Sequence, residues 1–359
     1  MQVDWVCSVG NYEGGYSVDK MSLPAISPKW LLDITDESLP GGHVCTYKNS
    51  LYVFSLRREG MCVRGLDLIT GETLWEKIHD FNQISQLCVN EEYVSTGYHL
   101  LDRKTGEIKA DLRIEIHELE EAGLGISLLM GDRLLKTKSK FDYDKGYISY
   151  ELKDGAYKCL DYRGLVQIAT KNLLITKSKD KIHCYDSATD LEVWSYGLSG
   201  QPDRFSKFIL TRNYLIVKNN EELMFLRIET GQLVKILNSG DISRALGHET
   251  EFGYDTQLLC LGDKLVILKS NIEEGWLSTF DLRSLCVVAC SALAVKVSAC
   301  VGGEFLFAVD REDNPVAYNL TTLTQCWKGG KPIDATKVIA GSGHIIYVFS
   351  GGGLQCYGP

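Results

Sequence analysis

Three kinds of residue in this chain could do chemistry: twelve cysteines, seven histidines and several clusters of carboxylates. The cysteines form no Cys-x-x-Cys pair, and no Cys/His group has the spacing of a zinc site. The histidines are scattered, at positions 43, 79, 99, 117, 183, 248 and 344. No Gly-x-Ser-x-Gly elbow, phosphate-binding loop or His-Glu-x-x-His motif occurs. The sequence therefore predicts no local catalytic motif, no metal site and no bound cofactor.

Acidic side chains concentrate in a few short segments, where they could attract a basic protein. Carboxylates gathered on one surface speed the arrival of an oppositely charged partner and help to select it. The alternative is a solvated rim that only keeps the protein soluble. The candidate partner-binding residues are the clustered acids and a few neighbours: Arg57, Arg58, Glu115, Glu118, Glu120, Glu121, Asp142, Tyr143, Asp144, His248, Glu249, Glu251, Glu273 and Glu274.

The composition narrows the range of partners and compartments. The formal net charge of −9 argues against nucleic acid, because a nucleic-acid binder needs a basic face to neutralise phosphates. No stretch approaches the roughly 18 apolar residues of a membrane-spanning helix. The segment Met1–Cys7 carries an acid where a secretory signal needs a basic region. We therefore expect a cytoplasmic protein, with no membrane contact, whose cysteines are free thiols.

A repeated phrase indicates which elements must position these residues. Its clearest copy is Leu66–Trp75, and weaker or degenerate copies follow the same pattern at 101–108, 151–155, 185–194, 226–233, 280–284 and 318–322. A repeat of roughly 40 residues built from short strands and tight turns is typical of a β-propeller. The sequence therefore predicts an all-β fold, a single propeller domain over residues 1–359. We count eight four-stranded blades, or seven if one weak copy is misread.

The two ends of the chain are expected to complete one blade together. The last hairpin, 344–349 with 353–357, is followed by no fourth strand. The segment Pro28–Ile34 resembles a fourth strand, with Trp30 in the place of Trp75, and it follows a lead segment, 1–27. We expect this N-terminal strand to close the last blade, because closure removes an open sheet edge.

The connections between strands differ in length on the two faces of such a ring. Labelling the four strands of a blade A to D, the A–B and C–D turns share one face and are short. The B–C and D–A connections share the other face and contain most of the extra length, at 57–60, 113–124, 139–146, 238–255 and 271–275. Long loops on a rigid scaffold are where binding usually resides, and the acidic clusters lie in these loops. The segment 114–123 is expected to include a short helix.

The Asp-x-x-Thr-Gly-x-x-x-Trp phrase resembles the repeat of the quinoprotein-like propellers. That family includes the pyrroloquinoline quinone dehydrogenases and a non-catalytic outer-membrane assembly lipoprotein. The resemblance implies that the Gly makes the C–D turn and that the Trp docks on the neighbouring blade. Tryptophan matches at 30, 75, 194 and 327, whereas Ala110, Cys159, Lys235 and Ala289 stand in the other copies. The adjacent cysteines of the dehydrogenases are missing, so the resemblance extends to the fold and not to the cofactor.

Two functions remain open from the sequence. The first is a non-enzymatic, monomeric interaction propeller that binds a basic protein through its acidic long-loop face. One form of it is a bacterial immunity protein that neutralises a toxin. The alternative is an enzyme, a hydrolase, lyase or quinoprotein-type enzyme, with its site in the central funnel.

Overall fold

The computed structural model describes most of the chain. The described residues are 7–8, 17–18, 21–34, 44–79, 87–96, 99–111, 127–130, 133–137, 147–152, 157–160, 162–170, 172–198, 207–219, 222–253, 255–270, 275–296, 299–330, 334–349 and 352–359. Within this part of the chain the structure is almost entirely β, with one α-helix. It is a β-propeller, as the repeat predicts.

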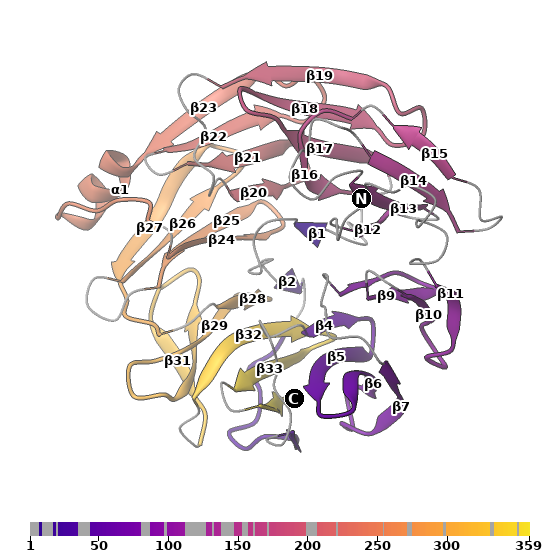
Figure 1. Cartoon of the computed structure of the whole chain (residues 1–359). Helices are drawn as coiled ribbons and strands as arrows, with labels where there is room; N and C mark the ends of the chain where they lie inside the picture. The colour runs from indigo at the N-terminus through magenta and orange to yellow at the C-terminus, as the bar shows by residue number, and fades with distance from the viewer. Residues whose placement is uncertain are drawn as a thin grey trace.

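The described strands form eight sheets arranged around a ring (Figure 1). The four antiparallel strands that all eight sheets share are labelled A to D from the axis outward, and two of the sheets have a fifth, two-residue strand at their inner edge. Chain order and spatial order coincide in seven of them, so neighbouring strands are joined by hairpins. The first four sheets are β4 (Val44–Tyr47), β5 (Ser50–Arg57), β6 (Gly60–Asp67), β7 (Thr73–His79); β8 (Cys88–Val89), β9 (Tyr93–Ser95), β10 (His99–Asp102), β11 (Ile108–Asp111); β12 (Ser127–Met130), β13 (Arg133–Thr137), β14 (Tyr147–Glu151), β15 (Tyr157–Leu160); and β16 (Leu165–Ala169), β17 (Leu173–Lys177), β18 (Lys181–Asp186), β19 (Glu192–Gly197).

The second half of the ring follows the same order until the last sheet. The next three sheets are β20 (Lys207–Leu210), β21 (Tyr214–Lys218), β22 (Glu222–Arg227), β23 (Leu233–Asn238); β24 (Thr256–Leu261), β25 (Lys264–Lys269), β26 (Trp276–Asp281), β27 (Cys286–Ala292); and β28 (Cys300–Gly302), β29 (Phe305–Val309), β30 (Pro315–Asn319), β31 (Gln325–Lys328). The last contains β32 (Ala335–Gly341), β33 (His344–Phe349), β34 (Gly353–Tyr357) and, outermost, β3 (Trp30–Asp33).

The N-terminal strand closes the ring as expected. β3 pairs antiparallel with β34, with Trp30 opposite Cys356 and Asp33 opposite Gly353. Ile34 and Leu354 of this sheet pack with Leu51 and Leu66 of the next sheet around the ring. The two ends of the chain thus share one sheet and contribute to the core between the last sheet and the first.

Two short strands of the lead segment lie inside the ring, which the sequence analysis did not predict (Figure 1). β1 (Cys7–Ser8) pairs antiparallel with β16, and β2 (Ser17–Val18) pairs parallel with β28. The A strands are the inner edges of their sheets, and an unpaired edge is an open row of backbone donors and acceptors. The N-terminal backbone satisfies part of two such edges.

Three tryptophans join neighbouring sheets in the way that the family resemblance implies. The indole N–H groups of Trp30, Trp75 and Trp194 donate to the carbonyls of Leu68, Arg103 and Ile228, at 3.0, 3.0 and 2.7 Å. Each ring covers the glycine of that neighbouring C–D turn: Gly71, Gly106 and Gly231, with φ of 77°, 70° and 68°. A Cβ at Gly71 would lie 2.7 Å from the Trp30 ring, so the position requires glycine for space as well as for φ.

A β-bulge precedes the tryptophan position and explains several exposed apolar side chains. Gly65 pairs with Trp75 but Leu66 pairs with Thr73, which leaves Leu74 as the extra residue. The same shift leaves Val193 unpaired before Trp194. Because a bulge reverses the alternation of side chains, the tryptophan turns inward and the preceding apolar residue turns out to solvent.

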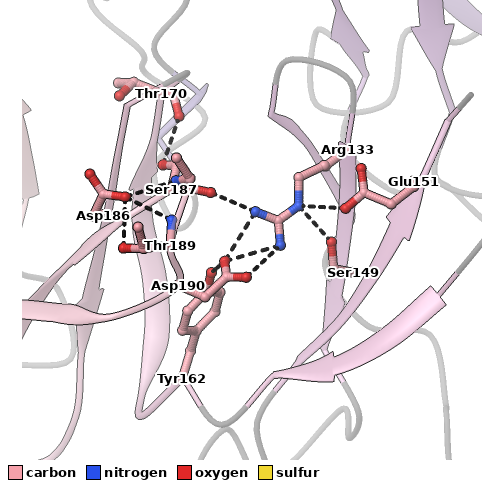
Figure 2. Close-up of polar contacts among 10 residues, drawn as sticks. Arg133, Ser149, Glu151, Tyr162, Thr170, Asp186, Ser187, Thr189 and Asp190 are labelled. Atoms are coloured by element: carbon pink, nitrogen blue, oxygen red, sulfur yellow. Dashed lines mark hydrogen bonds and ion pairs between the residues drawn. The ribbon is translucent and has the colours of Figure 1, made fainter.

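One junction replaces the tryptophan and the glycine with an ion pair (Figure 2). Cys159 stands at the tryptophan position of β15, and Asp190 stands at the glycine position of the next turn, with φ of 60°. The Arg133 guanidinium donates to the Ser187 carbonyl at 2.6 Å, the counterpart of the carbonyl that the indoles reach elsewhere. It also binds Asp190 through both terminal nitrogens, and the Tyr162 hydroxyl donates to the same carboxylate.

Other junctions are filled from the turn instead. Ala289 stands at the tryptophan position of β27, and Leu323, at the glycine position of the next turn, packs in the same apolar cluster. Leu323 has φ of 55°, so the turn keeps its left-handed residue without glycine. Trp327 is buried at the junction between the seventh and eighth sheets and packs edge-on against Tyr357, with a centroid distance of 5.4 Å. Its indole N–H has no hydrogen-bond partner among the described residues.

Candidate functional site

The candidate residues are expected on the face that has the B–C and D–A connections, which we call the long-loop face. The structure describes Arg57, Arg58, His248, Glu249 and Glu251. The other candidates lie outside the described residues: Glu115, Glu118, Glu120, Glu121, Asp142, Tyr143, Asp144, Glu273 and Glu274. The short helix expected within 114–123 also lies outside them.

Arg57 is held by its own sheet. Its guanidinium donates to both carboxylate oxygens of Glu76, at 2.7 and 3.0 Å, and Arg64 donates to the same carboxylate at 2.6 Å. Burial works against ionisation of Glu76, but the two guanidinium groups outweigh it and lower the pKa of this carboxyl. Arg58 lies exposed in the two-residue turn that joins β5 and β6. Arg58 is therefore the more available of the two for a partner.

The D–A connection between β23 and β24 contains the described helix, α1 (Ser239–Leu246), at the outer rim of the ring (Figure 1). A capping box starts it, because Asn238 accepts from the Asp241 amide and Asp241 accepts from the Asn238 amide. Gly247, with φ of 79°, ends it. The signal Asn-x-x-Asp was readable in the sequence, but the helix was expected in another connection.

The chain from the start of α1 to Phe252, which we call the α1 segment, is anchored to the core by apolar side chains and exposes charged ones. Ile242 on the helix and Phe252 after it are fully buried, in a cluster with Trp276. The Ser243 hydroxyl holds the returning chain by accepting from the Thr250 amide at 2.9 Å. His248, Glu249 and Glu251 lie exposed between these anchors. Part of the length that marks this loop thus serves packing, and the exposed charges are displayed on a fixed backbone.

A second acidic turn on this face was missed by the sequence analysis. The B–C turn between β29 and β30 brings together Asp310, Glu312 and Asp313, opposite Lys296 and Lys328. Burial opposes ionisation of Asp310, but hydrogen bonds from the amide and side chain of Asn314 lower the pKa of its carboxyl. The signal was the run Asp-Arg-Glu-Asp-Asn at 310–314, which repeat alignment alone treats as an ordinary hairpin turn.

The thiols behave as packing groups. Nine cysteines in the described part of the chain are free thiols, and those at 45, 62, 184, 300 and 356 are buried. Burial raises the pKa of Cys184 and Cys356 to about 12, so the reactive thiolate is scarce at neutral pH. Among the described residues no group of three or more His, Cys, Asp or Glu side chains could hold a metal ion.

The opposite face has an open depression of about 590 Å³. It lies against the A–B turns of the last two sheets, where Glu304 and Gly343 line it. The segment before β3 contributes Met21, and the C-terminal segment contributes Pro359. The central axis of the ring, where an enzyme site was the alternative expectation, is partly occupied by β1 and β2 (Figure 1). In the part of the chain that the structure describes, no helix is both long and apolar enough to cross a membrane.

Comparison with known proteins identifies relatives by fold only. No family model matches the chain, and no curated protein does. BamB from Moraxella catarrhalis is similar in structure, with a TM-score of 0.63 and 12% identity, over 93% of this chain and 97% of that one. The computationally designed Ika8 protein has a TM-score of 0.59 and 13% identity, over 96% of this chain and 100% of its own.

An enzyme has the same architecture. Quinohemoprotein alcohol dehydrogenase from Comamonas testosteroni has a TM-score of 0.56 and 10% identity, over 99% of this chain and 76% of its own. Identities this low establish the shared fold and leave function to be argued from the site. By its fold this chain is a β-propeller, similar to the propellers of BamB and the quinohemoprotein alcohol dehydrogenase.

Proposed function

We propose that the chain is a single interaction propeller, each of the eight sheets forming one blade, that binds a basic protein through its long-loop face. The observation that carries the proposal is the α1 segment. Ile242 and Phe252 fix its backbone to the core, and Glu249 and Glu251 between them are exposed. Because the backbone is already ordered, binding a partner through these carboxylates would lose little conformational entropy.

Two exposed carboxylates elsewhere on this face support the same partner. Glu312 and Asp334 have side chains that are 78% and 70% exposed, so their carboxylates can reach a partner although lysines lie near them. The sequence pattern assigns the acidic clusters at 115–121, 142–144 and 273–274, which lie outside the described residues, to connections of the same face. Their summed field would speed encounter with a basic surface and select against acidic ones.

The ring interior favours this proposal over an enzyme site in the funnel. The backbone of β1 and β2 pairs with two of the inner A strands and so takes up part of the space in which a funnel substrate would bind. We propose that the protein acts in the cytoplasm as a monomer until it meets its partner. Neutralisation of a basic toxin by an immunity protein is one form that such binding would take.

The experiment compares protein captured from the native host by three forms of the chain. One is the wild type, and the second reverses charge on the long-loop face with Glu249→Lys and Glu251→Lys. The third is a matched control with Glu229→Lys and Glu304→Lys, two exposed carboxylates in turns of the opposite face. We expect one basic protein to be captured by the wild type and the control and lost from the long-loop variant. Loss from the control alone would refute the choice of face.

A further inference from the structure

One serine lies at the end of a hydrogen-bonded chain of the kind that activates nucleophiles. The Ser178 hydroxyl is 3.2 Å from Nε2 of His183, and Nδ1 of His183 is 3.0 Å from Oε2 of Glu192. Ser178 is in the B–C turn between β17 and β18, and Glu192 begins β19 of the same sheet. A nucleophile, a base and a group that orients the base therefore form a chain in which each group lies within hydrogen-bond distance of the next.

The donors and acceptors define the tautomer of the neutral imidazole. The Glu192 carboxylate can only accept, so Nδ1 of His183 carries the hydrogen. Nε2 is then an acceptor, and the Ser178 hydroxyl is the donor beside it. The Lys181 carbonyl, 3.2 Å from the same hydroxyl, competes for that hydrogen. His183 is only 3% exposed, so water could not replace the hydroxyl as a donor to Nε2, whereas it can replace it at the turn carbonyl of Lys181. The hydrogen bond to Nε2 is therefore the one whose loss would destabilise the fold more.

The turn holds the serine in one place. The Ser178 amide donates to the Lys181 carbonyl at 2.9 Å, and the Leu198 amide donates to the Asp180 backbone carbonyl at 2.7 Å. The backbone at Gly164 approaches so closely that a Cβ there would overlap the Ser178 amide. His183 is buried beside Tyr185, with a ring centroid distance of 6.1 Å. Ser178 itself is half-buried, so the residue keeps some contact with solvent.

We propose that Ser178 is an activated nucleophile that accepts an acyl group from a carboxylic ester bearing a negative charge. The substrate class follows from Lys179 and Lys181, which are exposed, and Lys177, which is half-buried, on the same turn; Asp180 is the one acid among them. The inference is independent of the proposed binding function, since none of these residues belongs to the candidate partner-binding set.

The reaction balances with water as the second substrate. The Ser178 oxygen attacks the ester carbonyl while its proton moves to Nε2 of His183, and the alkoxide that leaves takes that proton back. A serine ester of the acyl group remains. Water then attacks this ester, gives a proton to His183, and the serine oxygen recovers it as the carboxylic acid departs. Glu192 positions the imidazole and stabilises its charged form without itself accepting the proton.

The test combines a covalent probe with ester hydrolysis by the intact chain. A fluorophosphonate should label the tryptic peptide that contains Ser178, and the label should be lost in Ser178→Ala. His183→Gln should slow labelling by roughly 100-fold or more, the usual contribution of a general base. The matched control is Ser195→Ala. Ser195 is exposed on β19 directly opposite His183, and its substitution should leave labelling unchanged.

Two further readouts separate activation from a structural role. Glu192→Gln should lower the labelling rate, and its labelling should depend on pH differently from that of the wild type. Mono-4-nitrophenyl succinate should be hydrolysed faster than 4-nitrophenyl acetate. Equal rates for the two esters would overturn the anionic substrate. Labelling of Ser178→Ala as strong as wild type, or no labelling of the wild type above heat-denatured protein, would overturn the proposal.

Discussion

Replacement of Trp75 by alanine should expose how the sheets are held together. Trp75 is 8% exposed, and its ring covers Gly106 in the turn of the following sheet. Its indole N–H donates to the Arg103 carbonyl at 3.0 Å. The substitution therefore removes apolar contacts, a hydrogen bond and the filling of a junction at once.

The size of the effect follows from these contacts. Truncating a buried Trp to Ala costs about 3–5 kcal/mol in the free energy of unfolding. Trp75→Phe keeps much of the ring but leaves the Arg103 carbonyl without its donor, which costs about 1–3 kcal/mol. Gly106→Ala should also destabilise the protein, because a methyl there overlaps the indole and φ is positive.

The assay is equilibrium unfolding in urea followed by far-ultraviolet circular dichroism, which does not depend on the tryptophan that is changed. We expect Trp75→Ala to lose more stability than Trp75→Phe. Leu74→Ala is the control, since the neighbouring bulge residue is 56% exposed and should cost little. A loss below about 1 kcal/mol for Trp75→Ala would refute the docking role.

The remaining predictions concern the ion pair, ring closure and acid stability. Arg133→Met should cost about 3–5 kcal/mol, because it leaves the partly buried Asp190 without its counter-charge, and adding Asp190→Gly should recover part of that loss in a double-mutant cycle. Deleting residues 1–36 removes β3 together with β1 and β2 and should cause aggregation or a large drop in melting temperature; unchanged melting would mean that the ring closes elsewhere. The pKa values of Glu76, Asp186 and Asp310 are lowered by their hydrogen bonds, so their stabilisation is complete above the ordinary carboxyl range of about 3.9–4.3 and is lost as pH falls through the lower folded values. Unfolding followed from pH 5 downward should show this loss, and Asp186→Asn should flatten it, since Asn319 makes the same turn without charge.

The sequence predicted the fold because the repeat combines features with few structural meanings. A Gly that must adopt positive φ, an Asp that accepts from the next turn amides and a Trp at fixed spacing identify the turn and the strand after it. The closing strand could be found for the same reason, since Trp30 stands where Trp75 does. Strand pairing then confirmed it.

Features that depend on side chains brought together across sheets could not be predicted. Arg133 replaces a tryptophan from a different strand, and its partner Asp190 is distant in sequence, so neither residue signals the exchange alone. β1 and β2 are two-residue strands, too short to show a periodicity, and they are strands only because they pair with the inner edges of two sheets. The Ser178–His183–Glu192 chain likewise exists because hairpin register places three unremarkable residues side by side.

The most direct test of the account is the association rate of the captured partner at low and at physiological salt. The wild type should associate quickly at low salt and more slowly as salt screens its carboxylates. Reversing Glu118, Glu120, Glu121, Glu249 and Glu251 to Lys should slow association and weaken its dependence on salt. We expect folding to be unchanged, because charges at solvent-exposed positions contribute little to stability, and circular dichroism would check this. The control with Glu229→Lys and Glu304→Lys should behave like the wild type. An association rate that is unaffected by the long-loop substitutions, or reduced as much by the control, would contradict the central claim.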